Sequence, residues 1–366
     1  MSIKPFKTTT EQYNILISRG LNIYNKEFFI QYINRNNYFN VINGNEDLLL
    51  VTPGNGNKFY DTATFDDFVR LHKFDKVLTN HLTTILHDFE TKLKTSIARN
   101  FTSSYCRTPE NTMQYTNRSN YLDLPNLFGP NYTLYNDQNK NIIDDYNKFL
   151  FFKRNYLNTL VKKNDFIDSG IFSIPSTSYT PPSNCVSYEE DGKQIVVPLW
   201  VAIETCDFGT LQRFCHYASK SVMKKILADF NLKTSDRDLF LNSLDVIREL
   251  RNKCAHFSLI NRFSTSSSVR ILPVLVNKLG LCPYQKIQNI TIPGIGKVVK
   301  NPGILNLYDT LKVLNLYEDL SRLKKPLKNI IYANNKYFKK KTYDLNSRLL
   351  ERMGNPDYSD WKKIFS

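Results

Sequence analysis

Long hydrophobic runs are missing from this sequence of 366 residues. No stretch approaches the roughly 18 consecutive apolar residues that a membrane-spanning helix requires. The N-terminal segment MSIKPFKTTTEQYNIL has neither the apolar core nor the small-residue cleavage site of a signal peptide. We therefore expect a soluble, cytoplasmic protein with no membrane partner.

Sequence signals of metal and cofactor sites are missing as well. The six cysteines are scattered, form no CxxC pair and have no histidine at zinc-finger spacing. His72, His81 and His87 fall in one expected helix, but without the HExxH spacing of a zinc site. The sequence predicts reduced thiols, no bound metal and no cofactor.

Acidic residues are few for the number of basic ones, 34 against 49, which gives a formal net charge of +15. A surplus of this size attracts polyanions, and nucleic acid is the first candidate. The alternative is the codon bias of an AT-rich genome, although such a bias raises Asp and Glu together with Lys. The chain also has 22 Tyr and 24 Phe, a composition that excludes a disordered polyelectrolyte and predicts a folded protein.

Apolar residues recur mainly with helical spacing, which predicts an all-α, mostly helical fold with minor β-hairpins. The clearest segment runs from Thr64 to about Phe101, where apolar residues recur every three or four positions without Pro or Gly. Other expected elements are helices over about 9–19, 25–39, 208–230 and 236–262, a strand in the apolar run at 48–50, and a hairpin at Asp191 and Gly192.

The order of these elements predicts three parts. An N-terminal helical segment spans 1–62, and a helical core spans 63–262 with two long insertions at about 103–140 and 168–197. A basic helical region follows at 263–366.

The expected helix at 236–262 carries the segment RNKCAH, which is notable for its polar residues. The apolar residues Ile247, Leu250, Cys254 and Phe257 span only about 80° of the helix circumference, so this stripe should pack against the core. Asn252 lies about 180° from the centre of the stripe, and His256 about 140°. Arg251 lies at the edge of the same polar face, so the face presents an imidazole, an amide and a guanidinium together.

These groups suit RNA cleavage without a metal. An imidazole can exchange protons with the ribose and the leaving oxygen near neutral pH, and a guanidinium can stabilise the charge that develops on the phosphate. One histidine does not easily perform both proton transfers, whereas a symmetric dimer would supply two. The alternative is an ordinary solvated polar face with an interfacial histidine.

A second polar feature lies near the C-terminus, where no acidic residue occurs between Leu320 and Tyr343. Cations for phosphates and flat rings for unstacked bases are the combination that single-stranded or looped RNA requires. A solvated, Lys-rich helix end is the alternative. The candidate RNA-binding residues here and in the lysine-bearing turn before it are Lys297, Lys300, Lys324, Lys325, Lys328, Lys336, Tyr337, Lys339, Lys340 and Lys341.

Beyond these residues, the sequence resembles the abortive-infection proteins of the AbiD/AbiF type, a branch of the HEPN ribonuclease superfamily. The resemblance is carried by blocks in the same order over most of the chain. They include KPFKTTTEQYNILISRGLNI at Lys4, NRNNYFNVINGN at Asn34, FDDFVRLHKFDKVLTNHLTTILHDFETKLKTSIA at Phe65, VPLWVAIETCDFGTLQRF at Val197, LRNKCAHFSLINR at Leu250 and MGNPDYSDWKKIF at Met353.

The resemblance implies a HEPN-type helical bundle that dimerises so that two R-x(4 to 6)-H motifs form one metal-independent endoribonuclease site. The motif corresponds to Arg251 and His256, with Asn252 in the polar position after the arginine. An acidic residue of an earlier helix often supports such sites, and Glu90 is the candidate. The family often has a polar or basic residue directly after the histidine, where this chain has Phe257.

The biological role that the resemblance implies is phage defence by RNA cleavage in the infected cell. It also implies a small, structured non-coding RNA as a partner, in addition to the target RNA. The competing hypothesis is a catalytically silent RNA-binding module in which the same helix face serves dimerisation.

Overall fold

The computed structural model describes residues 5–54, 58–122, 149–162, 172–285, 288–292, 296–300, 303–337 and 341–365. The chain divides into two compact units. Unit 1 comprises Met1–Leu86, Glu249–Val269 and Leu279–Ser366, and unit 2 comprises His87–Arg248 and Arg270–Lys278. The first two crossings between the units, after Leu86 and after Arg248, fall within long helices of the expected core, while the division into three parts remains a prediction. The mostly helical fold is confirmed.

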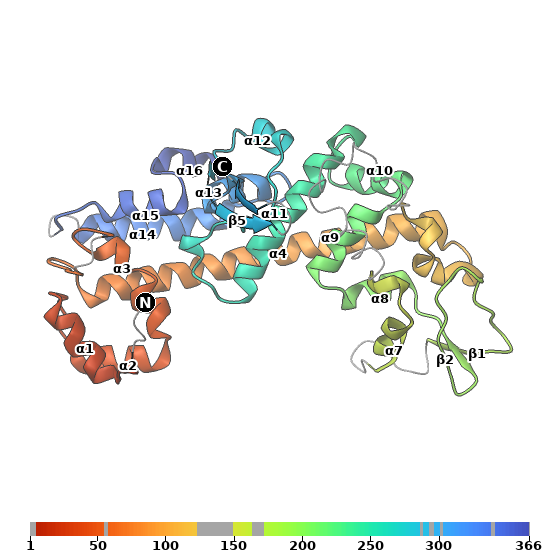
Figure 1. Cartoon of the computed structure of the whole chain (residues 1–366), viewed down its shortest axis with the longest axis horizontal. Helices are drawn as coiled ribbons and strands as arrows, with labels where there is room; N and C mark the ends of the chain where they lie inside the picture. Colours follow the sequence, from red (N-terminus) through yellow and green to blue (C-terminus); the bar gives the residue numbers. More distant parts are fainter. Residues whose placement is uncertain are drawn as a thin grey trace. The chain divides into compact units, whose positions relative to one another are not determined.

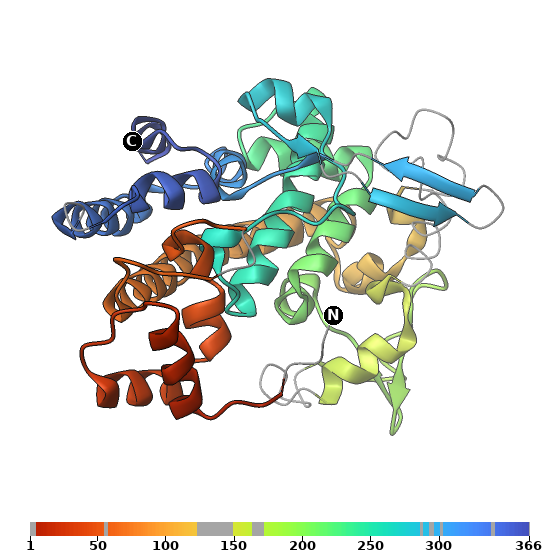
Figure 2. The same cartoon turned by 60° about the vertical axis from the view of Figure 1, so that its left-hand side comes forward.

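Unit 1 joins the two ends of the chain (Figures 1 and 2). Helices α14 (Lys324–Tyr337) and α15 (Leu345–Met353) lie side by side, and Arg70 of helix α4 (Phe65–Tyr105) donates a hydrogen bond to Asn334 of α14. Its other elements are α1 (Thr9–Ser18), α2 (Lys26–Arg35), the π-helix η1 (Phe39–Asn43), α3 (Glu46–Leu49), η8 (Ile260–Arg262), β4 (Tyr284–Gln285), β5 (Gln288–Ile292), β6 (Gly296–Lys300), β7 (Gly303–Ile304), α13 (Leu307–Leu314), η9 (Ser321–Leu323) and α16 (Tyr358–Ile364). Strands β4 and β7 pair, as do β5 and β6, both antiparallel.

Unit 2 is built from the second half of α4, most of α11 (Arg237–Ala255) and the shorter elements between them. These are η2 (Pro109–Thr116), η3 (Arg118–Asn120), η5 (Leu150–Phe152), α7 (Arg154–Lys162), β1 (Ser173–Pro175), β2 (Glu189–Glu190), β3 (Lys193–Ile195), α8 (Leu199–Ala202), η6 (Ile203–Thr205), α9 (Phe208–Tyr217), α10 (Lys220–Asp229) and η7 (Thr234–Asp236), followed after α11 by α12 (Pro273–Leu279). The predicted hairpin at Asp191 and Gly192 is confirmed: both residues have positive φ, and β1 adds a third strand to the pair.

Helix α4 agrees with its sequence pattern from end to end. Thr64 and Asp67 cap its start reciprocally, since the Thr64 amide donates to the Asp67 carboxylate and the Asp67 amide donates to the Thr64 hydroxyl. The predicted apolar stripe is buried along both halves of the helix, from Phe68 to Ile97. The side chains of this stripe are Phe68, Leu71, Phe74, Leu78, Leu82, Ile85, Phe89, Leu93 and Ile97.

The predicted elements at 48–50 and 208–230 were wrong. The apolar run at 48–50 is not a strand: α3 forms there, and the amide of Leu50 donates to the carbonyl of Glu46 at 3.0 Å. All three leucines are buried, so the run has no alternation that could separate the two structures. The expected helix at 208–230 is two helices, because the backbone becomes extended at Ala218 and Ser219 between α9 and α10.

A first test concerns Gly354, which ends α15 with φ +111°. A Cβ at this position would lie 1.9 Å from Cγ of Asn306, whose side chain caps α13 by accepting from the Asp309 amide. Gly354→Ala should therefore lower the free energy of unfolding by about 3 kcal/mol, through backbone strain and displacement of the cap. Urea denaturation gives this value.

The matched control is Gly280→Ala, since Gly280 also has positive φ but no atom within 4 Å of the added Cβ. It should cost only about 1 kcal/mol, the backbone part alone. Equal costs for the two variants would show that Asn306 imposes no steric constraint on residue 354.

Candidate functional site

Helix α11 ends earlier than predicted, at Ala255 rather than near Arg262. The chain turns in a Schellman motif: the Ser258 amide donates to the carbonyl of Lys253, and the Phe257 amide to that of Cys254, both at 3.1 Å. Phe257 adopts the left-handed conformation that this motif requires, with φ +49°. His256 is therefore the last residue before the turn, at the C-terminal end of the helix.

The buried and exposed faces of α11 agree with the prediction from its apolar stripe, except at Phe257 in this turn. Ile247, Leu250 and Cys254 are buried, and burial raises the pKa of the Cys254 thiol to about 12. Asn252 and His256 are exposed, as predicted, and Arg251 is half-buried. Phe257 was predicted to pack with the stripe, which is wrong: its side chain is 77% exposed because the left-handed turn ends the helical repeat.

The chain directly after the motif is fixed by a buried carboxylate. Asp75 of α4 is 5% exposed and accepts the backbone N–H groups of Ile260, at 3.2 Å, and Asn261, at 2.7 Å. Burial raises the pKa of Asp75 to about 6, although both hydrogen bonds act in the opposite direction. One side chain thereby holds both amides at the start of η8.

The same turn is tied to both ends of the chain. Arg352 of α15 donates to the Asn261 side-chain oxygen and to the Gly44 carbonyl, each at 2.9 Å, and pairs with Asp47. Burial lowers the pKa of Arg352 to about 10. The side-chain amide of Asn261 also donates to the side-chain oxygen of Asn45 at 3.4 Å. We refer to Asp75, Asn261, Arg352 and Asn45 as the loop anchor.

Glu90, the predicted supporting acid, belongs to unit 2, whereas Arg251, Asn252 and His256 belong to unit 1. Its carboxylate lies 3.7 Å from the ammonium of Lys94 on the same helix, and Lys94 also pairs with Glu204. Its association with the RNKCAH motif remains a prediction.

The predicted basic residues have different environments. Lys324, Lys325, Lys328 and Lys336 are exposed on α14, and the ring of Tyr332 between them is 73% exposed. Tyr337 is 41% exposed and has the Arg70 guanidinium 5.2 Å from its ring centroid. Lys339 and Lys340 lie outside the described residues, as do the side chains of Lys297 and Lys300 on β6.

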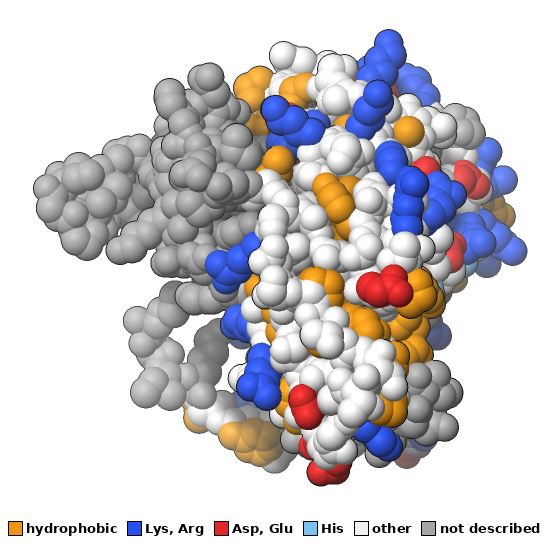
Figure 3. Space-filling view, turned by 90° about the vertical axis from the view of Figure 1, so that its right-hand side faces the viewer, with side chains coloured by type: hydrophobic (Ala, Val, Ile, Leu, Met, Phe, Trp, Pro, Cys, Tyr) orange, Lys and Arg blue, Asp and Glu red, His pale blue; other side chains and the backbone are white. Residues whose placement is uncertain are grey.

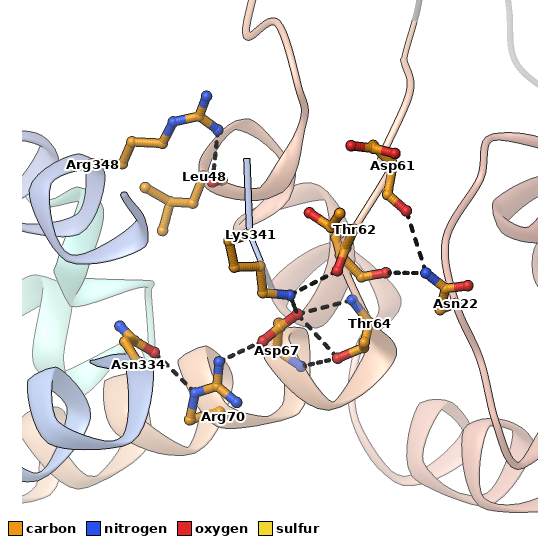
Figure 4. A network of polar contacts seen from close by, with 11 residues as sticks. Asn22, Leu48, Asp61, Thr62, Thr64, Asp67, Arg70, Asn334, Lys341 and Arg348 are labelled. Atoms are coloured by element: carbon orange, nitrogen blue, oxygen red, sulfur yellow. Dashed lines mark hydrogen bonds and ion pairs between the residues drawn. The ribbon is translucent and has the colours of Figure 1, made fainter. Parts of the chain in front are cut away.

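Lys341 has a structural role (Figure 4). Its ammonium is paired with the buried Asp67 carboxylate and donates to the Thr62 carbonyl at 2.9 Å. Burial opposes ionisation of Asp67, but Lys341 and Arg70 hold its pKa below the usual value. Since this side chain is only 5% exposed and its charge is already neutralised, we remove Lys341 from the predicted RNA-binding residues.

The basic residues are distributed unevenly along the chain, a signal that the overall composition conceals. Residues 250–343 contain 17 Lys and Arg and three Asp and Glu, and the rest of the chain contains 32 and 31. Nearly all of the surplus therefore comes from the segment that begins at the motif. A codon bias would distribute it along the whole chain. Basic side chains also gather at the upper right of the face drawn in Figure 3, which is the right-hand side of Figure 1, where α7 to α10 lie.

The described residues contain no metal site, no membrane-spanning helix and no disulfide. No group of three His, Cys, Asp or Glu side chains within them could hold a metal ion. Among the helices that the structure describes, none is long and apolar enough to cross a membrane. All six cysteines are free thiols, as predicted.

These features define a mostly helical protein in which Asn252 and His256 are exposed and Arg251 is half-buried at the end of α11, followed by a strongly basic segment. Residues 30–261 match the family of Abi-like proteins, and the chain belongs to this family. Family membership supports a role in abortive infection, a defence against phage. The comparison with curated proteins gave no match, and neither did the comparison with solved structures.

A second test concerns Asp75. Its raised pKa means that the folded state binds the proton more tightly than the unfolded state, so ionisation lowers the free energy of unfolding. This loss should develop between about pH 4 and about pH 7. It should reach about 3 kcal/mol, because a tenfold difference in proton affinity between the two states corresponds to about 1.4 kcal/mol. Asp75→Asn removes the ionisation, so its free energy of unfolding relative to the wild type should rise over this interval.

Urea titrations at several pH values measure this difference, with Asp66→Asn as the control because Asp66 is an exposed acid on the same helix. A constant difference between Asp75→Asn and the wild type across the interval would contradict the buried ionisation.

Proposed function

We propose that this Abi-like protein is a metal-independent endoribonuclease of the HEPN type. The observation that carries the proposal is the shared position of Arg251, Asn252 and His256 at the end of α11, where the loop anchor fixes the chain that follows. Asn252 and His256 are exposed there to a macromolecular substrate.

The proposed reaction is a transesterification followed by release. An imidazole takes the proton of a ribose 2′-hydroxyl, whose oxygen then attacks the adjacent phosphorus. The bond to the 5′-oxygen breaks, and that oxygen takes a proton from an imidazolium. The products are a 2′,3′-cyclic phosphate and a 5′-hydroxyl. Arg251 stabilises the charge that grows on the phosphate, and Asn252 orients it.

Each chain supplies a single RNKCAH motif, whereas the reaction needs a base and an acid. A homodimer with twofold symmetry would bring two His256 imidazoles and two Arg251 guanidinium groups to one phosphate. Glu90 would act as a positioning residue in such a site. The proposal therefore includes the dimer.

RNA is the substrate class because the charge surplus begins at the motif. On α14, Lys328, Tyr332 and Lys336 are spaced four residues apart and so share one face, with about 6 Å of rise between neighbours. Their exposed side chains alternate cation, ring and cation, which suits phosphates and unstacked bases. This face would hold a small, structured non-coding RNA, the target RNA, or both in turn. Such cleavage would arrest the infected cell.

A third test uses the catalytic side chains. His256→Ala should lower the rate of RNA cleavage by at least about 100-fold, and Arg251→Ala by a similar factor, because each removes a group used in the transition state. Cleavage by the wild type should persist in EDTA and leave 2′,3′-cyclic phosphate ends. Product ends are read by phosphatase and kinase treatment before gel analysis.

The control is His87→Ala, an exposed histidine on α4 that should retain full activity. Mixing the wild type with excess His256→Ala should lower activity beyond dilution if the two chains share one site. If cleavage survives His256→Ala or needs added magnesium, the mechanism fails, and a silent RNA-binding module becomes the better account.

A fourth test removes charge from α14. The triple variant Lys325→Gln, Lys328→Gln and Lys336→Gln should bind single-stranded RNA more weakly, and the slope of log affinity against log salt should decrease by about 2. Filter binding at several salt concentrations measures both. RNA that copurifies with the protein, extracted and sequenced, should be a single defined species and should decrease in the variant.

The control removes equal charge elsewhere, with Lys26→Gln, Lys73→Gln and Lys362→Gln, which are also exposed lysines. An equal decrease in affinity and slope for both triple variants would mean that net charge acts nonspecifically and that α14 is no binding surface.

A further inference from the structure

Phe257 occupies a backbone position that suits glycine. It is the residue that ends α11 in the left-handed region, with φ +49°, and a bulky side chain is strained there. Other turns with positive φ carry Asn231, Gly20, Gly280 and Gly354, the residue types that adopt this conformation readily. Helix termination alone therefore does not account for a phenylalanine at 257.

Packing does not account for it either. The side chain is 77% exposed, so it fills no core within the described part of the chain. A non-glycine residue held in the left-handed region costs stability, and such strained positions are typical of functional sites.

The residues beside Phe257 in sequence are mainly polar and basic. Asn252, Lys253 and His256 are exposed beside it in sequence, and Ser258 is half-buried. No acidic residue follows Glu249 until Asp309. An apolar contact between two protein surfaces would need apolar neighbours, whereas a ring among cations suits a nucleotide whose phosphate the cations attract.

We propose that Phe257 stacks on an unpaired nucleobase next to the phosphate on which Arg251 and His256 act. The inference rests on the proposed function and makes it more specific: the substrate is single-stranded or looped RNA, because paired bases are already stacked on their neighbours. Phe257 is then a binding and specificity residue, and the left-handed turn holds its ring beyond the end of the helix.

The test exploits opposite effects on stability and binding. Phe257→Gly relieves the backbone strain, so Tm should rise by about 1 to 2 °C. The same change removes the ring, so the affinity for a 12-nucleotide single-stranded RNA with one central 2-aminopurine should fall about tenfold. Binding is measured by anisotropy and 2-aminopurine quenching in a His256→Ala background, which prevents cleavage. Phe257→Trp should retain affinity and quenching.

A duplex of the same sequence serves as the second probe, and its affinity should be the same for Phe257 and Phe257→Gly. An unchanged affinity for the single strand overturns the inference, as does an equal loss for single strand and duplex. Dissociation of a dimer in Phe257→Gly, seen by light scattering, would instead assign the ring to a protein interface and also overturn it.

These experiments distinguish a failure of the stacking inference from a failure of the proposed nuclease function. If the wild type cleaves RNA and Phe257→Gly keeps its KM and its choice of cleavage sites, only the stacking fails. If the wild type cleaves nothing but Phe257→Gly loses quenching and affinity, the nuclease proposal fails and the stacking residue stands as part of an RNA-binding site.

Discussion

The buried carboxylate of Asp75 is the contact on which the candidate site depends. It accepts two consecutive backbone N–H groups from the turn after RNKCAH, at 2.7 and 3.2 Å. Backbone amides are fixed in direction, so two of them on one carboxylate determine both the position and the orientation of η8. The apolar stripe of α11 packs against the core, and the hydrogen bonds of Asp75 fix the chain that follows the helix. His256 lies at the end of the helix, between these two contacts.

The loop anchor is costly to build, and its composition shows how the cost is offset. An isolated buried carboxylate would take up a proton, and the pKa of Asp75 is indeed raised by burial. Arg352 brings a positive charge to the same cluster, and Asp47 compensates that charge in turn. Buried charge of this kind adds little net stability but selects one arrangement of the chain over others. Here the arrangement that the buried charge selects is the end of α11.

The loop anchor also joins segments that are far apart in sequence. The match to the Abi-like family covers residues 30–261, whereas Arg352 lies beyond it and completes the hydrogen bonds of Asn261.

Features with a periodic or capping signature could be predicted from the sequence. Helix α4 has an unbroken apolar stripe and a reciprocal cap, so its extent followed from local pattern. The end of α11 could not be predicted, because Phe257 stands where glycine would mark the stop. The role of Lys341 was hidden for another reason: its partner Asp67 is 274 residues away, and composition reports a charge without its counter-ion. Contacts between distant segments decide such cases, and no local pattern contains them.

The distribution of charge gives the strongest physical link between the motif and RNA. A net charge spread evenly over a surface raises affinity for any polyanion, but it does not direct the polyanion to one place. In this chain the segments outside 250–343 are nearly neutral, so the attraction is concentrated on the sequence that starts with Leu250 and Arg251. Under the proposed function, a phosphate attracted to that segment would meet the histidine, the arginine and the exposed ring at its beginning and the α14 lysines near its end. The field and the candidate chemistry therefore come from one continuous stretch of the chain, which is the arrangement expected if both serve the same nucleic acid.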